Sequence, residues 1–189
     1  MYKLFIDTHS DKVILVLYKD NKVLMSKIEK SNYHHSQIIM PMLDDLLKEN
    51  NIKTSDLKEI IVVNGPGSFT GVRICVTIAK TLAYTLSIPI KAIDSLLLKA
   101  INIESKNNIN VIEKEKNGVY LGIFNKNYEK QKEYRYLSNE EYEKILKDND
   151  IIDDVEIDYN KVLKYTETME SVNPHKVNPL YIKHIEVEK

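Results

Sequence analysis

Apolar and polar residues alternate in short runs over residues 1–30 and then change to a helical spacing. Apolar and β-branched residues dominate positions 2–8 and 12–18, a polar turn separates these runs, and a third run covers residues 21–30. This pattern predicts a β-hairpin with one further antiparallel strand. Residues 35–50 place apolar side chains at positions i, i+3, i+4 and i+7, which predicts a helix. Pro41 within that segment is expected to kink the helix or to begin its main body.

The next part of the chain alternates between buried strands and helices. The continuous apolar run at residues 60–63 is typical of a parallel strand that is buried on both faces. A glycine-rich loop, a helix to about Leu86 and a short strand at residues 88–93 follow. Asp94 or Ser95 is expected to cap another helix. Residues 1–103 are therefore predicted to form an α/β lobe with a mixed sheet.

After residue 103 the sequence changes character. Residues 104–110 are polar, and the stretch that follows predicts strands with a tight turn at Asn117 and Gly118. Ser138 is expected to cap a short helix over residues 139–147. Acidic residues outnumber lysines between residues 140 and 158, which indicates a solvated face and a poor surface for nucleic acid. We therefore expect a second lobe over residues 104–189.

Composition narrows the class of protein further. The 189 residues are 43% hydrophobic, which suits one domain or two small packed lobes. The net charge of -1 gives no global reason to expect nucleic-acid binding. With Cys75 as the single cysteine, no internal disulfide is possible. The first residues do not resemble a signal peptide, and no apolar run approaches the length of a membrane span, so we expect a soluble, cytoplasmic protein.

The sequence NGPGSFTGVR at residues 64–73 lies between a predicted strand and a predicted helix, where backbone N–H groups favour an anion. The spacing of Gly65, Gly67 and Gly71 matches neither the P-loop nor the dinucleotide-binding motif. A phosphate-binding loop and a tight turn that packs Phe69 and Val72 beneath the helix therefore remain alternatives. The weak candidates for binding a cofactor are Asp7, Thr8, Gly67, Ser68 and Arg73, the last being one of two arginines.

No residue pattern clearly supports catalysis. Asp7 ends the first strand, where an aspartate reaches a metal or phosphate in some nucleotide-binding folds but more often caps a turn. The five histidines include no pair spaced to chelate a metal from one helix face. Ser36 and Ser68 lack the context of an activated nucleophile, and Cys75 fits a core position. We therefore expect no catalytic residue and no metal site.

The two predicted N-terminal helices have apolar faces wider than a helix on a sheet requires. In the second of them, Val76, Ala79 and Ala83 lie on one stripe, and Ile74 and Ile78 extend it. Burial beneath another layer of the same chain would explain this width. Packing against a second subunit, as half of a four-helix bundle, would explain it equally well.

The segment NGPGSFTGVRI resembles the signature of the bacterial TsaB (YeaZ) family. LFIDTHSDKVILVLY, HHSQIIMPMLDDLL and IPIKAIDSL are similar to its opening strands, its first helix, and the strand and cap after its second helix. The resemblance covers residues 1–103 and is faint in IEKEKNGVYLGIF and NPLYIK. The chain departs from the family pattern at Cys75, where glycine is common. It also lacks the arginine of an Asp-Ala-Arg pattern in the second lobe.

This resemblance implies an actin- and Hsp70-like (ribonuclease-H-like) α/β fold, with a mixed-sheet N-terminal lobe and a shortened C-terminal lobe. It implies a non-catalytic subunit that supports the transferase TsaD in the synthesis of threonylcarbamoyladenosine (t6A). The modified adenosine lies next to the anticodon in tRNAs that decode ANN codons. TsaE is expected as a further partner, with tRNA bound only through the complex and a homodimer when TsaD is absent. Threonylcarbamoyl-AMP, which derives from ATP, and a metal are expected on the partner subunit, and no cofactor on this chain.

The helices that bind the partner in the family correspond to residues 33–50 and 69–86 of this chain. The expected interface residues are His35, Ile38, Ile39, Met42, Leu46, Phe69, Arg73, Val76, Ala79, Lys80 and Ala83. The alternative is a stand-alone enzyme of the same superfamily, either a metallopeptidase-like protein or an ATPase.

Overall fold

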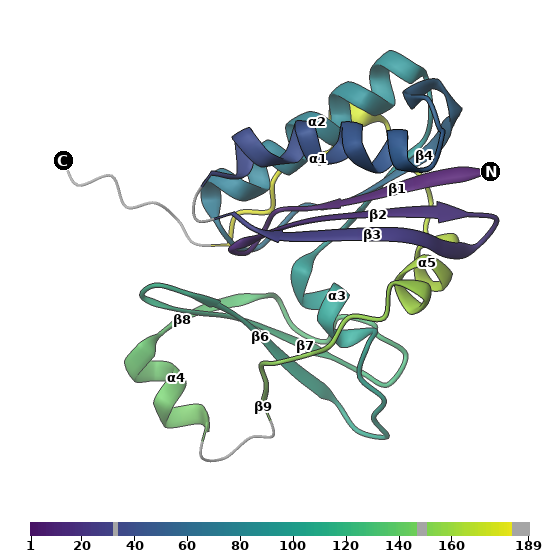
Figure 1. Ribbon diagram of the computed structural model, residues 1–189. Helices are drawn as coiled ribbons and strands as arrows, with labels where there is room; N and C mark the ends of the chain where they lie inside the picture. Colours follow the sequence, from purple (N-terminus) through teal and green to yellow (C-terminus); the bar gives the residue numbers. More distant parts are fainter. Residues whose placement is uncertain (32–33, 147–150, 183–189) are drawn as a thin grey trace.

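The computed structural model describes residues 1–31, 34–146 and 151–182, which contain two β-sheets with helices packed against them (Figure 1). The first sheet has the strand order β3-β2-β1-β4-β5. Its strands are β1 (Tyr2–Asp7), β2 (Lys12–Lys19), β3 (Lys22–Lys30), β4 (Leu57–Val63) and β5 (Ile90–Ile93). Strands β1, β2 and β3 pair antiparallel, whereas β4 pairs parallel with both β1 and β5. The mixed sheet predicted for the first lobe is therefore confirmed.

Helices cover both faces of this sheet (Figure 1). Helices α1 (His35–Glu49) and α2 (Phe69–Leu86) lie on one face, and α3 (Ser95–Ala100) and α5 (Tyr159–Glu167) lie on the other. Side chains alternate along β1, so Leu4 and Ile6 are buried against α1 and α2, while Phe5 packs with Leu98 of α3 and Leu163 of α5. Burial on both faces explains why β1, β2 and β4 read as nearly continuous apolar runs.

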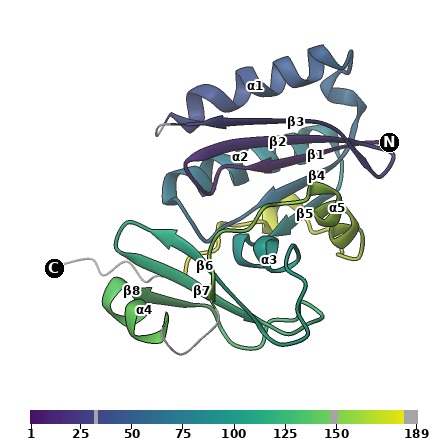
Figure 2. The ribbon, with the colours of Figure 1, turned by 60° about the horizontal axis from the view of Figure 1, so that its bottom comes forward.

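The second sheet has the strand order β8-β7-β6-β9 and lies beyond α3 (Figure 2). Its strands are β6 (Ile109–Glu115), β7 (Gly118–Phe124), β8 (Arg135–Ser138) and β9 (Ile151–Ile152), and α4 (Asn139–Leu146) lies against β7 and β8. Helix α3 joins the two sheets. Leu98 belongs to the core of the first sheet, while Leu96 packs with Val111 and Phe124 of the second.

The predicted helix caps are confirmed, and the predicted hairpin turn is displaced by one residue. Asp94 caps α3 by accepting the Leu97 N–H at 2.8 Å, and Ser138 caps α4 by accepting the Glu141 N–H at 3.3 Å. The hairpin turn is one residue earlier than predicted, because Gly118 already pairs with Glu115 in the β6–β7 ladder. A Cβ at Gly118 would lie 2.1 Å from the Leu137 carbonyl oxygen, so the glycine serves a close strand approach.

Three other features differ from the sequence-based prediction or extend it. Helix α1 begins at His35 and runs through Pro41, so its main body does not begin at the proline. Helix α5 and strand β9 were not predicted, although Asp158 caps α5 and its apolar residues have helical spacing. Lys147, expected at the end of α4, lies outside the described residues. No helix within the described ranges is both long and apolar enough to cross a membrane.

The end of the described chain returns to the first lobe and runs along α2. The Val172 N–H donates to the Ile90 carbonyl at 2.9 Å, and the Leu180 N–H donates to the Asn64 carbonyl at 2.7 Å. Val177 is buried in the core beneath α1 and α2. Residues far apart in the sequence therefore build one side of the first lobe, and the boundary at residue 103 stays a prediction.

We predict that Leu163→Ala lowers the free energy of unfolding by about 2–5 kcal/mol, because it leaves a cavity where α5 meets the first sheet. Leu146→Ala is the matched control, since Leu146 lies on α4 and its side chain is 46% exposed. Urea unfolding followed by circular dichroism measures both variants. Equal losses in the two would contradict the packing described for α5.

Candidate functional site

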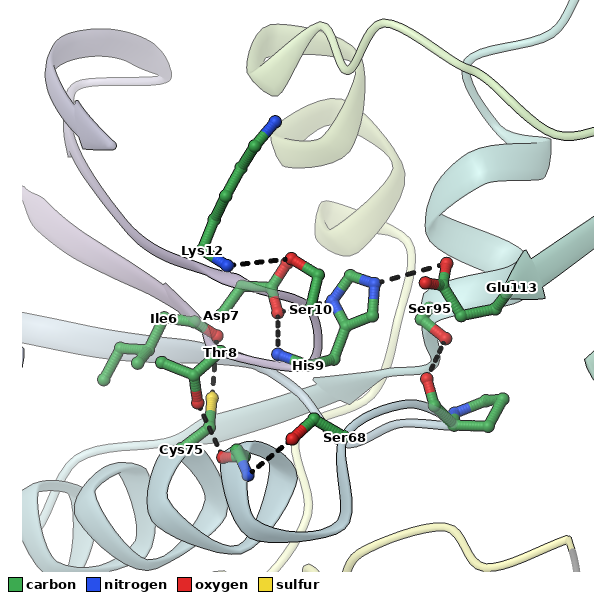
Figure 3. Close-up of polar contacts among 12 residues, drawn as sticks. Ile6, Asp7, Thr8, His9, Ser10, Lys12, Ser68, Cys75, Ser95 and Glu113 are labelled. Carbon is green, nitrogen blue, oxygen red and sulfur yellow. Dashed lines mark hydrogen bonds and ion pairs between the residues drawn. The ribbon is translucent and has the colours of Figure 1, made fainter. Parts of the chain in front are cut away.

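The turn between β1 and β2 lies where the glycine loop, α2 and the second sheet meet (Figure 3). Its backbone is fastened to the glycine loop, because the Ser68 N–H donates to the His9 carbonyl at 2.7 Å. The Thr8 hydroxyl donates to the Gly71 carbonyl at 2.6 Å, and the Cys75 thiol donates to the Ile6 carbonyl at 3.1 Å. Cys75 is fully buried, as expected from the sequence.

Two glycines of this loop, Gly67 and Gly71, are required by the approach of that turn. A Cβ at Gly71 would lie 2.0 Å from the Thr8 carbonyl oxygen, and a Cβ at Gly67 would lie 2.4 Å from the His9 carbonyl oxygen. Ser68 caps α2 by accepting the Gly71 N–H at 3.2 Å. The loop is thus a tight turn that holds β1 against α2, and Val72 is buried as expected. Phe69, however, is 43% exposed and does not pack beneath the helix.

His9 connects the two sheets through a chain of charges. Its Nδ1 lies 2.6 Å from Asp7 Oδ1, and its Nε2 lies 3.4 Å from Glu113 Oε2 on β6. The Lys99 ammonium on α3 lies 2.8 Å from the same Glu113 oxygen. Asp7, His9 and Glu113 are buried, and Lys99 is half-buried. The junction between the lobes is therefore occupied by the protein's own charged side chains.

The local charges set the protonation states at this junction. Burial alone lowers the pKa of His9, but the carboxylates of Asp7 and then Glu113 outweigh it and raise the pKa from 6.5 to about 10. Burial raises the pKa of Glu113, whereas His9 and Lys99 outweigh that effect and lower it from 4.5 to about 2. At neutral pH an imidazolium therefore lies between two carboxylates. This arrangement does not suit a phosphate, because its positive charge is already neutralised.

The other weak cofactor candidates also have intramolecular partners. The Arg73 Nε donates to the Tyr181 hydroxyl at 2.8 Å, and its guanidinium lies 4.1 Å from the centre of the Phe69 ring. Thr8 and Ser68 hold the loop as described, and Asp7 holds His9. Cofactor binding by these residues stays a prediction. Among the described residues, no group of three or more histidine, cysteine, aspartate or glutamate side chains is placed to hold a metal ion.

The predicted interface residues differ in how far they are buried within this chain. Seven are buried within this chain: His35, Ile39, Met42, Leu46, Val76, Ala79 and Ala83. Ile38 and Lys80 are half-buried, and Phe69 and Arg73 are exposed. Much of the apolar width of α1 and α2 is thus used against the first sheet. The role of these residues in a subunit interface stays a prediction, and Tyr33, at the start of the predicted helix range, lies outside the described residues.

Sequence reasoning did not single out His9, Glu113 or Lys99. His9 lies two residues after Asp7 within the predicted hairpin turn. This close spacing is the local sequence signal that the two side chains can pair. Glu113 lies far along the chain in β6, directly after the buried residues Val111 and Ile112, and its strand also carries Lys114 and Glu115, so nothing in the local sequence marks it as a buried ion-pair partner. Only the packing of α3 between the sheets shows that the three side chains meet.

Comparisons with known proteins show which proteins this chain is similar to. A family model described as TsaD, tRNA N6-adenosine threonylcarbamoyltransferase, matches residues 24–154. The tRNA threonylcarbamoyladenosine biosynthesis protein TsaB of Bacillus subtilis is 37% identical over 64% of this chain and 54% of that protein. The uncharacterized protein MG208 homolog of Mycoplasma pneumoniae is 28% identical over 96% of this chain and 95% of that protein. The structure of YeaZ from Pseudomonas aeruginosa matches with a TM-score of 0.77 at 21% identity, covering 95% of this chain and 100% of that chain.

The two helix-covered sheets have the actin- and Hsp70-like α/β fold, so the fold class expected from the sequence is confirmed. The chain belongs to the family that the matching model describes and, within it, to the TsaB (YeaZ) proteins. It spans about half the length of the curated TsaB relatives it matches.

We predict that Gly71→Ala lowers the free energy of unfolding by about 1–3 kcal/mol, because the new methyl group meets the Thr8 carbonyl. At a helix position with free space, replacing glycine by alanine would stabilise the helix by up to about 1 kcal/mol. The sign of the measured change therefore tests whether the Thr8 carbonyl lies close to position 71. Thermal unfolding measures it. Thr70→Ala, at an exposed position of the same helical turn, is the control and is expected to change little.

We also predict that His9 makes stability depend on pH above neutrality. Its pKa is raised on folding, so its stabilising effect is complete below about pH 6.5 and is lost as pH rises toward about 10. A tenfold change in proton affinity on folding corresponds to about 1.4 kcal/mol, so the loss amounts to a few kcal/mol. Urea unfolding of the wild type and of His9→Gln at pH values between 6 and 10 measures the contribution of His9, which is the difference between the free energies of unfolding of the two proteins. A difference that does not change with pH would contradict the charged state assigned to His9.

Proposed function

We propose that this chain is a non-catalytic subunit in the synthesis of t6A on tRNA and that it binds and supports the transferase TsaD. The observation that carries the proposal is apolar surface left on the outer sides of α1 and α2 in a member of the TsaB family. Met40 on α1 is 48% exposed, and Phe69 and Tyr84 on α2 are 43% and 64% exposed. Exposed apolar side chains on two neighbouring helices favour contact with another protein.

The chemistry of the junction supports a role without catalysis. The charges of Asp7, His9 and Glu113 satisfy one another, so none of them is free to act as a general base near neutral pH. Burial raises the pKa of the Cys75 thiol, which disfavours the reactive thiolate. We therefore assign threonylcarbamoyl-AMP and the metal to TsaD and no cofactor to this chain.

The remaining partners follow from the same role. TsaE is the proposed third component, and a homodimer through α1 and α2 is the proposed state when TsaD is absent. The net charge of -1 and the acidic α4 region disfavour direct tRNA binding, so tRNA contacts this chain only through the complex. The complex works where tRNA is modified, in the cytoplasm.

The exposed residue on α1 provides the sharpest test. Met40→Glu is expected to weaken the complex with the cognate TsaD about tenfold or more, because it places a charge in an apolar contact. Leu146→Glu makes the same kind of change at a similarly exposed position on α4 and is expected to leave the affinity unchanged. Isothermal titration calorimetry with purified TsaD measures both, and circular dichroism checks that each variant is folded.

Two results would overturn the proposal. The first is the lack of any complex when the wild-type chain and the cognate TsaD are mixed. The second is ATP hydrolysis or stoichiometric metal binding by the isolated chain that is lost in Asp7→Ala, which would favour the stand-alone enzyme. Equal weakening by Met40→Glu and Leu146→Glu would place the interface away from α1.

A further inference from the structure

A separate pocket of about 640 Å³ lies between the start of α3, the loop that follows β7, α5 and the returning C-terminal segment. This volume is in the range of pockets that bind small molecules. Aromatic rings form much of its wall: Phe124, Tyr128, Tyr134, Tyr165 and Tyr181. The Tyr128 and Tyr165 rings pack edge to face with their centres 6.2 Å apart, and those of Phe124 and Tyr134 lie 5.9 Å apart. The wall is thus held by contacts among its own rings.

The charged groups of this pocket are mainly acidic. Asp94, Glu129 and Glu133 line it, against Lys130 as the lining cation. The Asp94 carboxylate is held in place, because it accepts the Leu97 N–H at 2.8 Å and the Tyr134 hydroxyl at 2.9 Å. A carboxylate has about four acceptor positions, so further donors can still be accommodated. Burial raises the pKa of Asp94, and a bound cation would offset the cost of its charge.

Lys130 shows which chemistry this environment favours. Its ammonium lies 5.0 Å from the centre of the Tyr134 ring and 2.9 Å from a Glu133 oxygen. A cation over an aromatic face and beside a carboxylate is stabilised by both. At the rim of the pocket, where the Lys130 and Glu133 side chains are 40% and 89% exposed, an ammonium group thus already lies over a ring and beside a carboxylate. Asp94 and Glu129 are the other carboxylates in the wall.

We propose that this pocket binds a small organic cation that carries N–H donors, such as a guanidinium or primary ammonium compound. The tyrosine rings stack on the cation, and Asp94 and Glu129 accept its hydrogen bonds. Phosphorylated ligands are disfavoured, because three carboxylates face one ammonium group. No residue of α1 or α2 lines the site, although Tyr181 in its wall also contacts Phe69 and Arg73 of α2.

The test uses propylguanidinium as the probe and propylurea as its neutral counterpart of the same shape. In a nuclear magnetic resonance titration of the whole chain, propylguanidinium is expected to shift the signals of Tyr128, Tyr134 and Tyr165 in a saturable way. Propylurea is expected to leave them unchanged. A response to propylurea as strong as that to propylguanidinium would overturn the proposal.

Three variants make the test specific. Glu129→Gln removes a charge but keeps the oxygen that accepts from Asn125 Nδ2 at 2.7 Å, and it is expected to weaken binding about fivefold. Lys130→Gln removes the competing ammonium and is expected to strengthen binding about fivefold. Glu140→Gln, at an exposed position on α4, is the control and is expected to change nothing.

The opposite signs of the first two variants exclude a structural explanation, since unfolding would weaken binding in both. Weaker binding of propylguanidinium by Lys130→Gln would mean that the lysine ammonium does not compete with the bound cation, and the proposal would fail. Tighter binding of the peptide acetyl-Gly-Arg-Gly-amide than of propylguanidinium would also overturn the assignment to a small molecule, because it would indicate an arginine side chain of another protein.

Discussion

The close approach of the β1–β2 turn to the first turn of α2 is the constraint on which the rest of the arrangement depends. Only glycine at position 71 leaves room for the Thr8 carbonyl, and the Thr8 hydroxyl then bonds to the backbone of that same glycine. This approach fixes where β1 ends, and therefore where His9 projects. From that position the imidazole reaches Glu113 on the second sheet, so one backbone contact also sets the spacing of the two lobes.

A glycine loop before a helix is usually considered as an anion site, yet here the helix N-terminus is used by the protein itself. Ser68 caps it, and the His9 carbonyl accepts the Ser68 N–H. The positive charges at the junction are those of His9 and Lys99, and Asp7 and Glu113 neutralise them. Removing such a buried ion from its partners is costly, so the junction is suited to hold the lobes together rather than to exchange ligands. Function is then expected at the outer surfaces of the chain.

Local sequence signals were sufficient to predict most of the helices and strands. They were not sufficient to predict the contacts between residues far apart in the sequence. Strands β1 to β5, helices α1 to α4 and the caps at Asp94 and Ser138 follow from periodicity and capping chemistry that lie within a few residues of each other. Helix α5 was missed because it follows an acidic stretch that was interpreted as a solvated face, although Asp158 caps it. The contact of His9 with Glu113 could not be derived, since neither residue's surroundings in the sequence indicate which strand lies opposite. The aromatic pocket around Asp94 was missed for the same reason, as it joins α3, β7 and the C-terminal segment.

The width of the apolar face on α2 has an internal explanation on both of its sides. Helix α1 covers one flank, and the returning segment covers the other, where Val177 is buried, the His175 ring packs on Tyr84 at 5.0 Å, and Tyr181 packs on Phe69 at 5.3 Å. The outward positions between Phe69 and Tyr84 include Arg73 and the threonines at 77 and 81, so the apolar surface left for a partner is discontinuous. A subunit that binds there must meet polar groups as well as apolar ones. An interface of that kind resembles a separable protein complex more than the core of a four-helix bundle, which needs a continuous apolar seam.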